Sequence, residues 1–165
     1  MRQTQSAPGS DLTITDREVI VTRVLKAPRE MVFDAWTDPK QVIQWFGPNG
    51  FTTTTKNMDA RTGGEWRFIM HGPDGTDFPN YIKFIEVVRP SKLVYKHAAE
   101  KEDEPGQFMV SVTFEAQGKN TLMTMKSVFK SAEVLAFVIR EYKADIGAKK
   151  NADRLEAYLA TISKQ

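Results

Sequence analysis

Strand-like alternation of hydrophobic and polar positions dominates the middle of the chain. From Thr52 to Phe129, segments rich in Val, Ile, Thr and aromatic residues are separated by short stretches that contain Gly, Pro and Asn. Branched and aromatic side chains suit a pleated, half-buried surface, and Gly, Asn and Pro supply the backbone angles of turns. The pattern predicts one strand over residues 16–26 and six more over residues 52–60, 64–71, 78–89, 92–99, 107–117 and 120–130. Because the connections among these six are short, consecutive strands should pair antiparallel.

Two short helices are predicted between the first strand and the second. Pro28 suits the first turn of a helix, because its missing N–H would have no partner there in any case. Apolar residues follow it at helical spacing. Asp38-Pro39 is a second start signal, a capping side chain followed by proline, and Gly47-Pro48 ends that helix.

The C-terminal part of the chain predicts a long helical segment that begins at Ser131, a good N-cap residue. It carries two apolar stripes, Leu135, Val138, Ile139, Tyr142 and Ile146, then Ala148, Ala152, Leu155, Leu159 and Ile162. The step from 146 to 148 is too short for one continuous face. A break is therefore expected near residues 145–147, with Asp145 as the cap of the final helix.

These elements together predict an α+β fold with a helix-grip arrangement. A curved antiparallel sheet of about seven strands has one face to cover, and the long C-terminal helix is the element available to lie across it. The two short helices after the first strand would close one end. Residues 1–10 are polar and are expected to form a disordered N-terminal tail, and residues 11–165 are expected to form a single domain.

Composition and charge exclude several classes of function. The 165 residues include 23 Lys and Arg against 21 Asp and Glu, a net charge of +2, which argues against a dedicated nucleic-acid binder. There is no cysteine, so disulfides and thiolate catalysis are excluded, and the two histidines belong to no metal-binding motif. No apolar run approaches the roughly 18 residues that cross a bilayer, and residues 1–10 are no secretory signal. We therefore expect no metal, no cofactor, no membrane insertion and a cytoplasmic location.

A sheet that wraps a helix can leave a cavity between them, and many apolar side chains are predicted to face that space. Phe and Met suit an adaptable pocket, although they also suit an ordinary core. Ala148 and Ala152 on the facing helix are small and would leave volume unfilled, which favours a pocket. The expected ligand-binding cavity is lined by Trp45, Phe46, Trp66, Phe68, Met70, Phe84, Tyr95, His97, Phe108, Met123, Met125, Ala148, Ala152 and Leu155.

Three polar residues of the predicted sheet are weak catalytic candidates. Tyr95 and His97 share one strand face and would orient a ligand if that face lines the cavity; the alternative for His97 is a strand end in solvent. Glu86 interrupts the apolar positions of its strand, so it is either a cavity carboxylate or half of an exposed cross-strand ion pair. His71 precedes a turn that contains Asp74. It is a candidate base, but a role in shaping the hairpin is favoured, because no Ser or Cys nucleophile signature accompanies it.

Several motifs, in order along the chain, resemble the SRPBCC superfamily (START-like and Bet v 1-like proteins). They are Val21-Thr22-Arg23-Val24, Val32-Phe33-Asp34-Ala35-Trp36-Thr37-Asp38-Pro39, Trp45-Phe46-Gly47-Pro48, Gly63-Gly64-Glu65-Trp66-Arg67-Phe68, Met70-His71-Gly72-Pro73-Asp74-Gly75, Glu86-Val87-Val88-Arg89-Pro90 and Asp153-Arg154-Leu155-Glu156-Ala157-Tyr158-Leu159. Together they are similar to the branch named for the activator of heat-shock-protein-90 ATPase, over roughly residues 16–163. The similarity is to the C-terminal domain of that activator.

The resemblance implies a helix-grip fold and three possible functions. The first is binding of a hydrophobic or amphipathic small molecule between the sheet and the C-terminal helix. The second is a polyketide-cyclase-like enzyme that uses the same cavity, with Glu86, Tyr95 and His97 as candidate proton-transfer groups. The third is a chaperone-associated protein, as a monomer or homodimer. Because the catalytic constellation is incomplete, we expect a binding protein rather than an enzyme.

Overall fold

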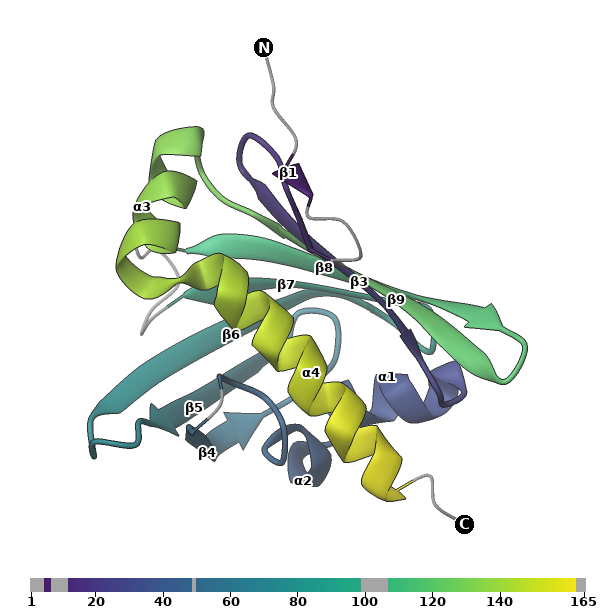
Figure 1. Ribbon diagram of the computed structural model, residues 1–165. Helices are drawn as coiled ribbons and strands as arrows, with labels where there is room; N and C mark the ends of the chain where they lie inside the picture. Colours follow the sequence, from purple (N-terminus) through teal and green to yellow (C-terminus); the bar gives the residue numbers. More distant parts are fainter. Residues whose placement is uncertain (1–4, 7–11, 49, 99–106, 163–165) are drawn as a thin grey trace.

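The computed structural model describes residues 5–6, 12–48, 50–98 and 107–162 (Figure 1). The elements follow the chain in the order β1 (Gln5–Ser6), β2 (Leu12–Ile14), β3 (Glu18–Leu25), α1 (Arg29–Thr37), α2 (Pro39–Val42), β4 (Thr52–Met58), β5 (Glu65–His71), β6 (Asp77–Val88), β7 (Lys92–Ala98), β8 (Phe108–Gln117), β9 (Asn120–Val128), α3 (Ala132–Tyr142) and α4 (Ala144–Ile162). None of these helices is long and apolar enough to span a membrane.

One antiparallel sheet contains every strand of the described chain, in the order β1-β2-β3-β9-β8-β7-β6-β5-β4. The sheet curves around α4, which lies diagonally across its concave face (Figure 1). The predicted α+β helix-grip fold is therefore confirmed. The seven predicted strands appear as β3 to β9, and the sheet has nine strands because β1 and β2 extend one edge. Strands of two and three residues are too short to show a period in the sequence.

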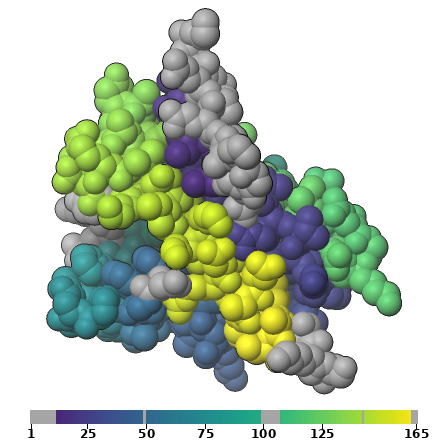
Figure 2. All heavy atoms as spheres, viewed as in Figure 1, coloured from purple at the N-terminus to yellow at the C-terminus, as the bar shows by residue number. Residues whose placement is uncertain are grey.

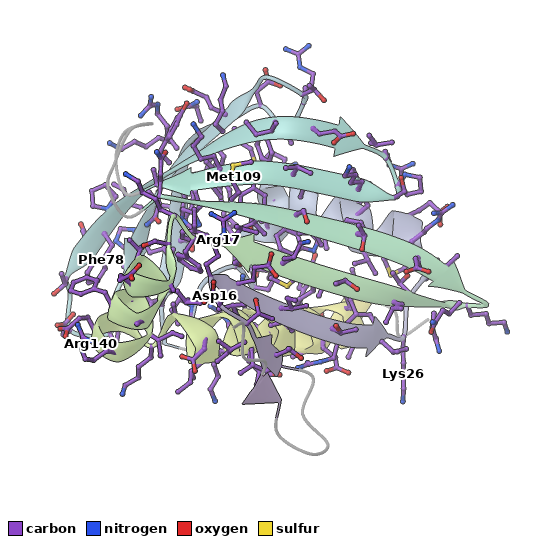
Figure 3. All side chains as sticks on the ribbon, turned by 90° about the horizontal axis from the view of Figure 1, so that it is seen from above. Asp16, Arg17, Lys26, Phe78, Met109 and Arg140 are labelled. Atoms are coloured by element: carbon purple, nitrogen blue, oxygen red, sulfur yellow. The ribbon has the colours of Figure 1, made fainter. Side chains whose placement is uncertain are left out.

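The first predicted strand begins later than expected. β3 starts at Glu18, because the preceding residues connect it to β2 through a hydrogen bond from the Thr15 N–H to the Glu18 carbonyl, at 3.0 Å. Figure 3 marks the two ends of β3 by Asp16 and Arg17 and by Lys26. Gln5 and Ser6 of the expected tail form β1 and pair with β2. The rest of residues 1–10 lies outside the described residues, so the disorder of that tail stays a prediction.

The two early helices form where the sequence predicts them. Pro28 is the residue before the first turn of α1 rather than a member of it, with an extended ψ of 151°. Asp38 caps α2, because its side chain accepts a hydrogen bond from the Lys40 N–H at 2.9 Å, and Pro39 is the first helical residue. This cap is confirmed as the sequence predicts it. The two helices close one end of the space under the sheet (Figure 1).

The predicted break in the C-terminal helical segment exists but lies elsewhere. Ser131 caps α3 by accepting a hydrogen bond from the Val134 N–H at 3.1 Å. α3 ends at Tyr142, and the left-handed backbone of Lys143 (φ 53°) separates it from α4. The break therefore precedes residues 145–147, and Asp145 lies within the first turn of α4. The break lies two residues before the predicted position. The predicted cap was wrong, because Asp145 is inside α4, and Ile146, which the prediction placed in the first apolar stripe, is exposed.

An ion-pair network that the sequence did not reveal holds α4 to the first long strand. Arg23 of β3 reaches Asp153 and Glu156 of α4, both at 2.8 Å. Along a neighbouring stripe α4 buries Ala152, Leu155 and Leu159 in the core. One helix is thus fixed by a buried apolar stripe and by a bridging guanidinium, which positions its small Ala residues over the sheet.

Candidate functional site

The residues predicted to line a cavity gather in one cluster between the sheet and α4. The fully buried members are Trp45, Phe46, Trp66, Phe68, Phe84, Tyr95, Met123, Met125, Ala152 and Leu155. Met70, Phe108 and Ala148 are partly buried and pack against this cluster. The ring of His97 lies 5.1 Å from that of Phe108 and 6.1 Å from that of Phe68. The structure therefore brings the predicted set together, and a ligand-holding role for it stays a prediction.

Aromatic rings form one wall of this cluster. Trp66 and Phe68 alternate along β5, so both point to the concave face, and their rings stack at 3.8 Å. Phe46 meets both rings edge-on, at 5.1 Å and 5.8 Å between centroids. Edge and stacked contacts of this kind add to the free energy of burial. The wall is thus a firm apolar surface against which the flat body of a ligand can pack.

Tyr95 and His97 bring polar atoms into this apolar surrounding. Both lie on β7, and their rings are 6.4 Å apart. His97 Nε2 lies 2.7 Å from Asn80 Oδ1 on β6. Because a carbonyl oxygen only accepts, Nε2 carries the proton and Nδ1 is left as an acceptor in the neutral ring. Burial lowers the pKa of His97 to about 4 and raises the pKa of Tyr95, so both side chains are uncharged at neutral pH.

One polar atom of this interior is buried without a partner among the described residues, and it lies near Tyr95. The indole N–H of Trp36 on α1 is fully buried without a hydrogen bond. Tyr95 is 3% exposed, and burial raises the pKa of its hydroxyl. The two rings lie 6.2 Å apart. A buried donor without an acceptor costs about 1–3 kcal/mol, so a polar ligand group at this place would recover stability.

Glu86 does not join Tyr95 and His97. A β-bulge between Phe84 and Glu86 shifts the register of β6 against β7, so that Phe84 pairs with Tyr95 and Glu86 with Val94. The extra residue reverses the alternation of side chains along the strand. The Glu86 carboxylate is 46% exposed and pairs with Lys92 at 3.1 Å. Of the two predicted alternatives for Glu86, the structure therefore shows the exposed ion pair. Alternation in the sequence could not reveal the bulge that causes it.

His71 also lies outside the cluster, on the outer face of the sheet. Its Nδ1 lies 2.7 Å from Asp77, and its Nε2 lies 2.8 Å from the Thr54 hydroxyl. The turn residue Asp74 instead accepts a hydrogen bond from the Thr76 N–H at 3.0 Å. The expected partner of His71 was therefore the wrong aspartate, because the hairpin aligns His71 with Asp77 across the strands. Among the described residues, no three His, Asp or Glu side chains gather as metal ligands.

Two residues of α4 clamp the loop that follows α2. Asn151 accepts a hydrogen bond from the Gly47 N–H at 2.9 Å. Arg154 Nη1 donates to the carbonyls of Gly47 and Pro48, both at 3.0 Å, and lies 3.4 Å from that of Phe51. Two motifs about 100 residues apart in sequence are thus joined in space. This clamp fixes Phe46 and its neighbours against the sheet.

Trp36, Asn80 and Arg154 are the site residues that the sequence reasoning missed. Trp36 belongs to the helical apolar spacing after Pro28, and Asn80 alternates with Ile82 and shares its strand face, so periodicity carried a signal for both. Arg154 carried none, because its partners are backbone carbonyls more than 100 residues away.

The comparisons with known proteins agree with this fold. A protein of Arthrobacter aurescens is similar with a TM-score of 0.81 and 22% identity, over 96% of this chain and 91% of that one. A protein of Nitrosomonas europaea is similar with a TM-score of 0.80 and 22% identity, over 90% and 97%. DynU16, from the dynemicin biosynthetic locus, is similar with a TM-score of 0.65 and 23% identity, over 88% of this chain and 48% of that one.

The comparison with curated proteins finds no match to the chain. The model of the family described as activator of Hsp90 ATPase homolog 1-like protein matches residues 26–160, which include α1, α2, β4 to β9, α3 and most of α4. The chain therefore belongs to the family of activator of Hsp90 ATPase homolog 1-like proteins.

Proposed function

We propose that this protein binds a small amphipathic molecule between the sheet and α4. The observation that carries the proposal is the unpartnered Trp36 N–H inside an otherwise apolar cluster, with the Tyr95 ring 6.2 Å away. A plain core would leave this N–H unsatisfied at a cost in stability. A ligand whose polar group bonds to it, and whose body packs on the aromatic wall, removes that cost.

The chemistry of the polar groups defines the ligand class. His97 and Tyr95 are uncharged at neutral pH, so no charge on the protein compensates a charged ligand here. The Trp36 N–H donates, the His97 Nδ1 accepts, and the Tyr95 hydroxyl does either. The ligand is therefore a neutral aromatic or alicyclic compound that carries a hydroxyl or carbonyl group.

The cluster has a partly exposed end through which such a ligand would enter. His97, Phe108 and Ala148 are only partly buried, whereas Trp36, at the α1 end, is 2% exposed. The ligand body would therefore enter beside His97, with its polar group leading toward Tyr95 and Trp36.

Hydroxynaphthalene and naphthalene provide a matched pair of probes. All three tryptophans of the chain are buried, so quenching of their fluorescence reports binding in the interior. We expect hydroxynaphthalene to bind wild type more tightly than naphthalene does. Tyr95→Phe should weaken hydroxynaphthalene binding by roughly three- to tenfold, the value of one hydrogen bond, and leave naphthalene binding unchanged.

Tyr158→Phe is the control, because the Tyr158 ring packs against the cluster while its hydroxyl is already bonded to Gln41. Absence of any quenching by either probe, or equal effects of the two Tyr→Phe variants, would contradict the proposal. Native mass spectrometry of the purified protein supplies a second readout, a copurified neutral compound.

A second candidate function, proton transfer on such a ligand, is favoured by one observation. His97 presents an uncharged ring nitrogen, oriented by Asn80, beside the Tyr95 hydroxyl. A neutral imidazole can take a proton next to a carbonyl while a phenol donates to the carbonyl oxygen. With tetralone in heavy water, exchange of the protons next to its carbonyl should be accelerated by wild type and not by His97→Gln. Equal exchange rates with and without protein would contradict the proton-transfer function and would not affect the proposal that the protein binds a ligand.

A further inference from the structure

A groove separate from the interior cluster lies between α4 and the residues that follow α2. It has a volume of about 370 Å³ and is lined by Gln44, Arg154, Ala157, Tyr158 and Thr161. Ligand sites commonly have volumes of roughly 300–1,000 Å³. Figure 2 shows this face of the molecule, with α4 in yellow crossing it and the blue α2 region beside its C-terminal half. The groove is therefore large enough for a small organic molecule and open to solvent.

The guanidinium of Arg154 has no carboxylate partner among the described residues. All of its hydrogen bonds leave from Nη1 and end on the backbone carbonyls of the 47–51 loop. Nε and Nη2 make no hydrogen bond to the described part of the chain, in a side chain that is itself partly buried and lines the groove. A desolvated cation without a counter-charge is unfavourable, and a fork of N–H donors matches a carboxylate in shape.

The other lining groups supply one more donor and an apolar wall. The Gln44 side chain is exposed and makes no hydrogen bond to the described residues, so its amide N–H groups are available. The hydroxyls of Tyr158 and Thr161 are already used as donors, to Gln41 and to the Tyr158 carbonyl. Ala157 and the ring of Tyr158 present carbon to the groove.

We propose that this groove binds a small carboxylate that carries an apolar body. The carboxylate lies on the Nε and Nη2 N–H groups of Arg154, with the Gln44 amide as a second donor, and the body packs on Ala157 and the Tyr158 ring. None of the five lining residues is acidic. The carboxylate of Asp38 acts electrostatically on Tyr158. It already accepts hydrogen bonds from the Lys40 N–H and from the Gln41 side-chain amide.

Benzoate and its neutral analogue benzamide test the proposal by proton–nitrogen NMR. We expect benzoate to shift the Arg154 Nε–H and Gln44 side-chain signals, and benzamide to leave them in place. Gln44→Glu tethers a carboxylate inside the groove without touching the Arg154 clamp. It should weaken benzoate binding roughly tenfold or more, as the loss of a charge-assisted contact does.

Gln117→Glu is the matched control, because it makes the same charge change at the exposed last residue of β8. It should leave benzoate binding unchanged. Arg154→Lys keeps the positive charge but loses the planar N–H donors of the guanidinium. It should therefore weaken both benzoate binding and the hydrogen bonds to the 47–51 loop. The proposal is overturned if benzoate moves neither signal, if both Gln→Glu variants act alike, or if inorganic phosphate binds more tightly than benzoate. Tyr95→Phe should not affect benzoate, which separates this site from the interior one.

Discussion

At the residue scale, the three tryptophans differ in how the protein satisfies them. The Trp45 N–H donates to the Ala35 carbonyl and the Trp66 N–H to the Thr55 hydroxyl, both at 3.0 Å. The Trp36 N–H, equally buried, has no acceptor among the described residues. Since buried indole N–H groups usually find a partner, Trp36 is the exception that points to a ligand.

His97 makes the stability of the fold depend on pH. Its pKa is about 4 in the folded protein and 6.5 in a free side chain. Between these values the unfolded chain binds a proton that the folded chain does not, so the free energy of unfolding falls as pH falls from 6.5 to 4. The full loss is up to about 3 kcal/mol, and it vanishes in His97→Gln. Urea unfolding at pH 7, 6, 5 and 4 measures it.

His71→Gln is the control for that series, because it removes the other histidine from the outer face of the sheet. A wild-type curve that parallels His97→Gln over this pH range would show that His97 is protonated in the folded protein and that its surroundings are wet.

At the element scale, two arginine ion pairs differ in burial and should differ in their contribution to the free energy of unfolding. The Arg23 side chain, which ties β3 to α4, is 13% exposed, whereas Arg61, which pairs with Asp59, is 82% exposed. Removing one partner of a partly buried pair leaves charges uncompensated, and exposed pairs contribute about 0–1 kcal/mol.

Arg23→Ala is therefore expected to lower the free energy of unfolding by roughly 2–4 kcal/mol. Arg61→Ala should leave the free energy of unfolding nearly unchanged, because water screens this exposed pair. Urea unfolding of both variants at the same pH gives the comparison. Equal losses would mean that the apolar stripe alone holds α4 to the sheet.

Ala152 provides the test of space beneath α4. It is fully buried against the cluster, while Ala160 on the same helix is exposed. If a ligand occupies the volume beside Ala152, Ala152→Phe should abolish hydroxynaphthalene binding without loss of stability, because the ring fills that volume. Ala160→Phe should change neither. A stability loss of about 1–3 kcal/mol with binding unchanged would identify a close-packed core instead.

At the scale of the whole molecule, the first long strand pairs with the last strand in the interior of the sheet order. β3 pairs with β9 along its full length, from Glu18 opposite Val128 to Leu25 opposite Thr121. β1 and β2 add only a short extension beyond β3. The first ten residues thus contribute only the two-residue β1 to the described sheet.

Deleting residues 1–10 should therefore change the free energy of unfolding by less than about 1 kcal/mol, since this segment lacks apolar side chains that could pack. Thermal and urea unfolding of the shortened chain provide the measurement. A loss of several kcal/mol would show that the segment packs on the rest of the fold.

Local patterns along the chain determined most of the fold and the membership of the interior cluster. Alternation identified β3 to β9, and capping chemistry placed α2 and α3 at Asp38 and Ser131, because these signals involve only neighbouring residues. Apolar residues that share one face of a strand or helix pack together in the core. For this reason the residues predicted to line a cavity form one cluster.

Only the tertiary structure decided which polar groups serve the interior and which do not. Because of the bulge beside Glu86, its carboxylate pairs with Lys92. Because of the hairpin register, His71 lies within hydrogen-bond distance of Asp77. The guanidinium of Arg154 donates to backbone carbonyls. The buried Trp36 N–H has no acceptor among the described residues. Hydrophobic periodicity is a property of a segment, whereas hydrogen bonding and counter-charge depend on partners that the chain brings together only when it folds.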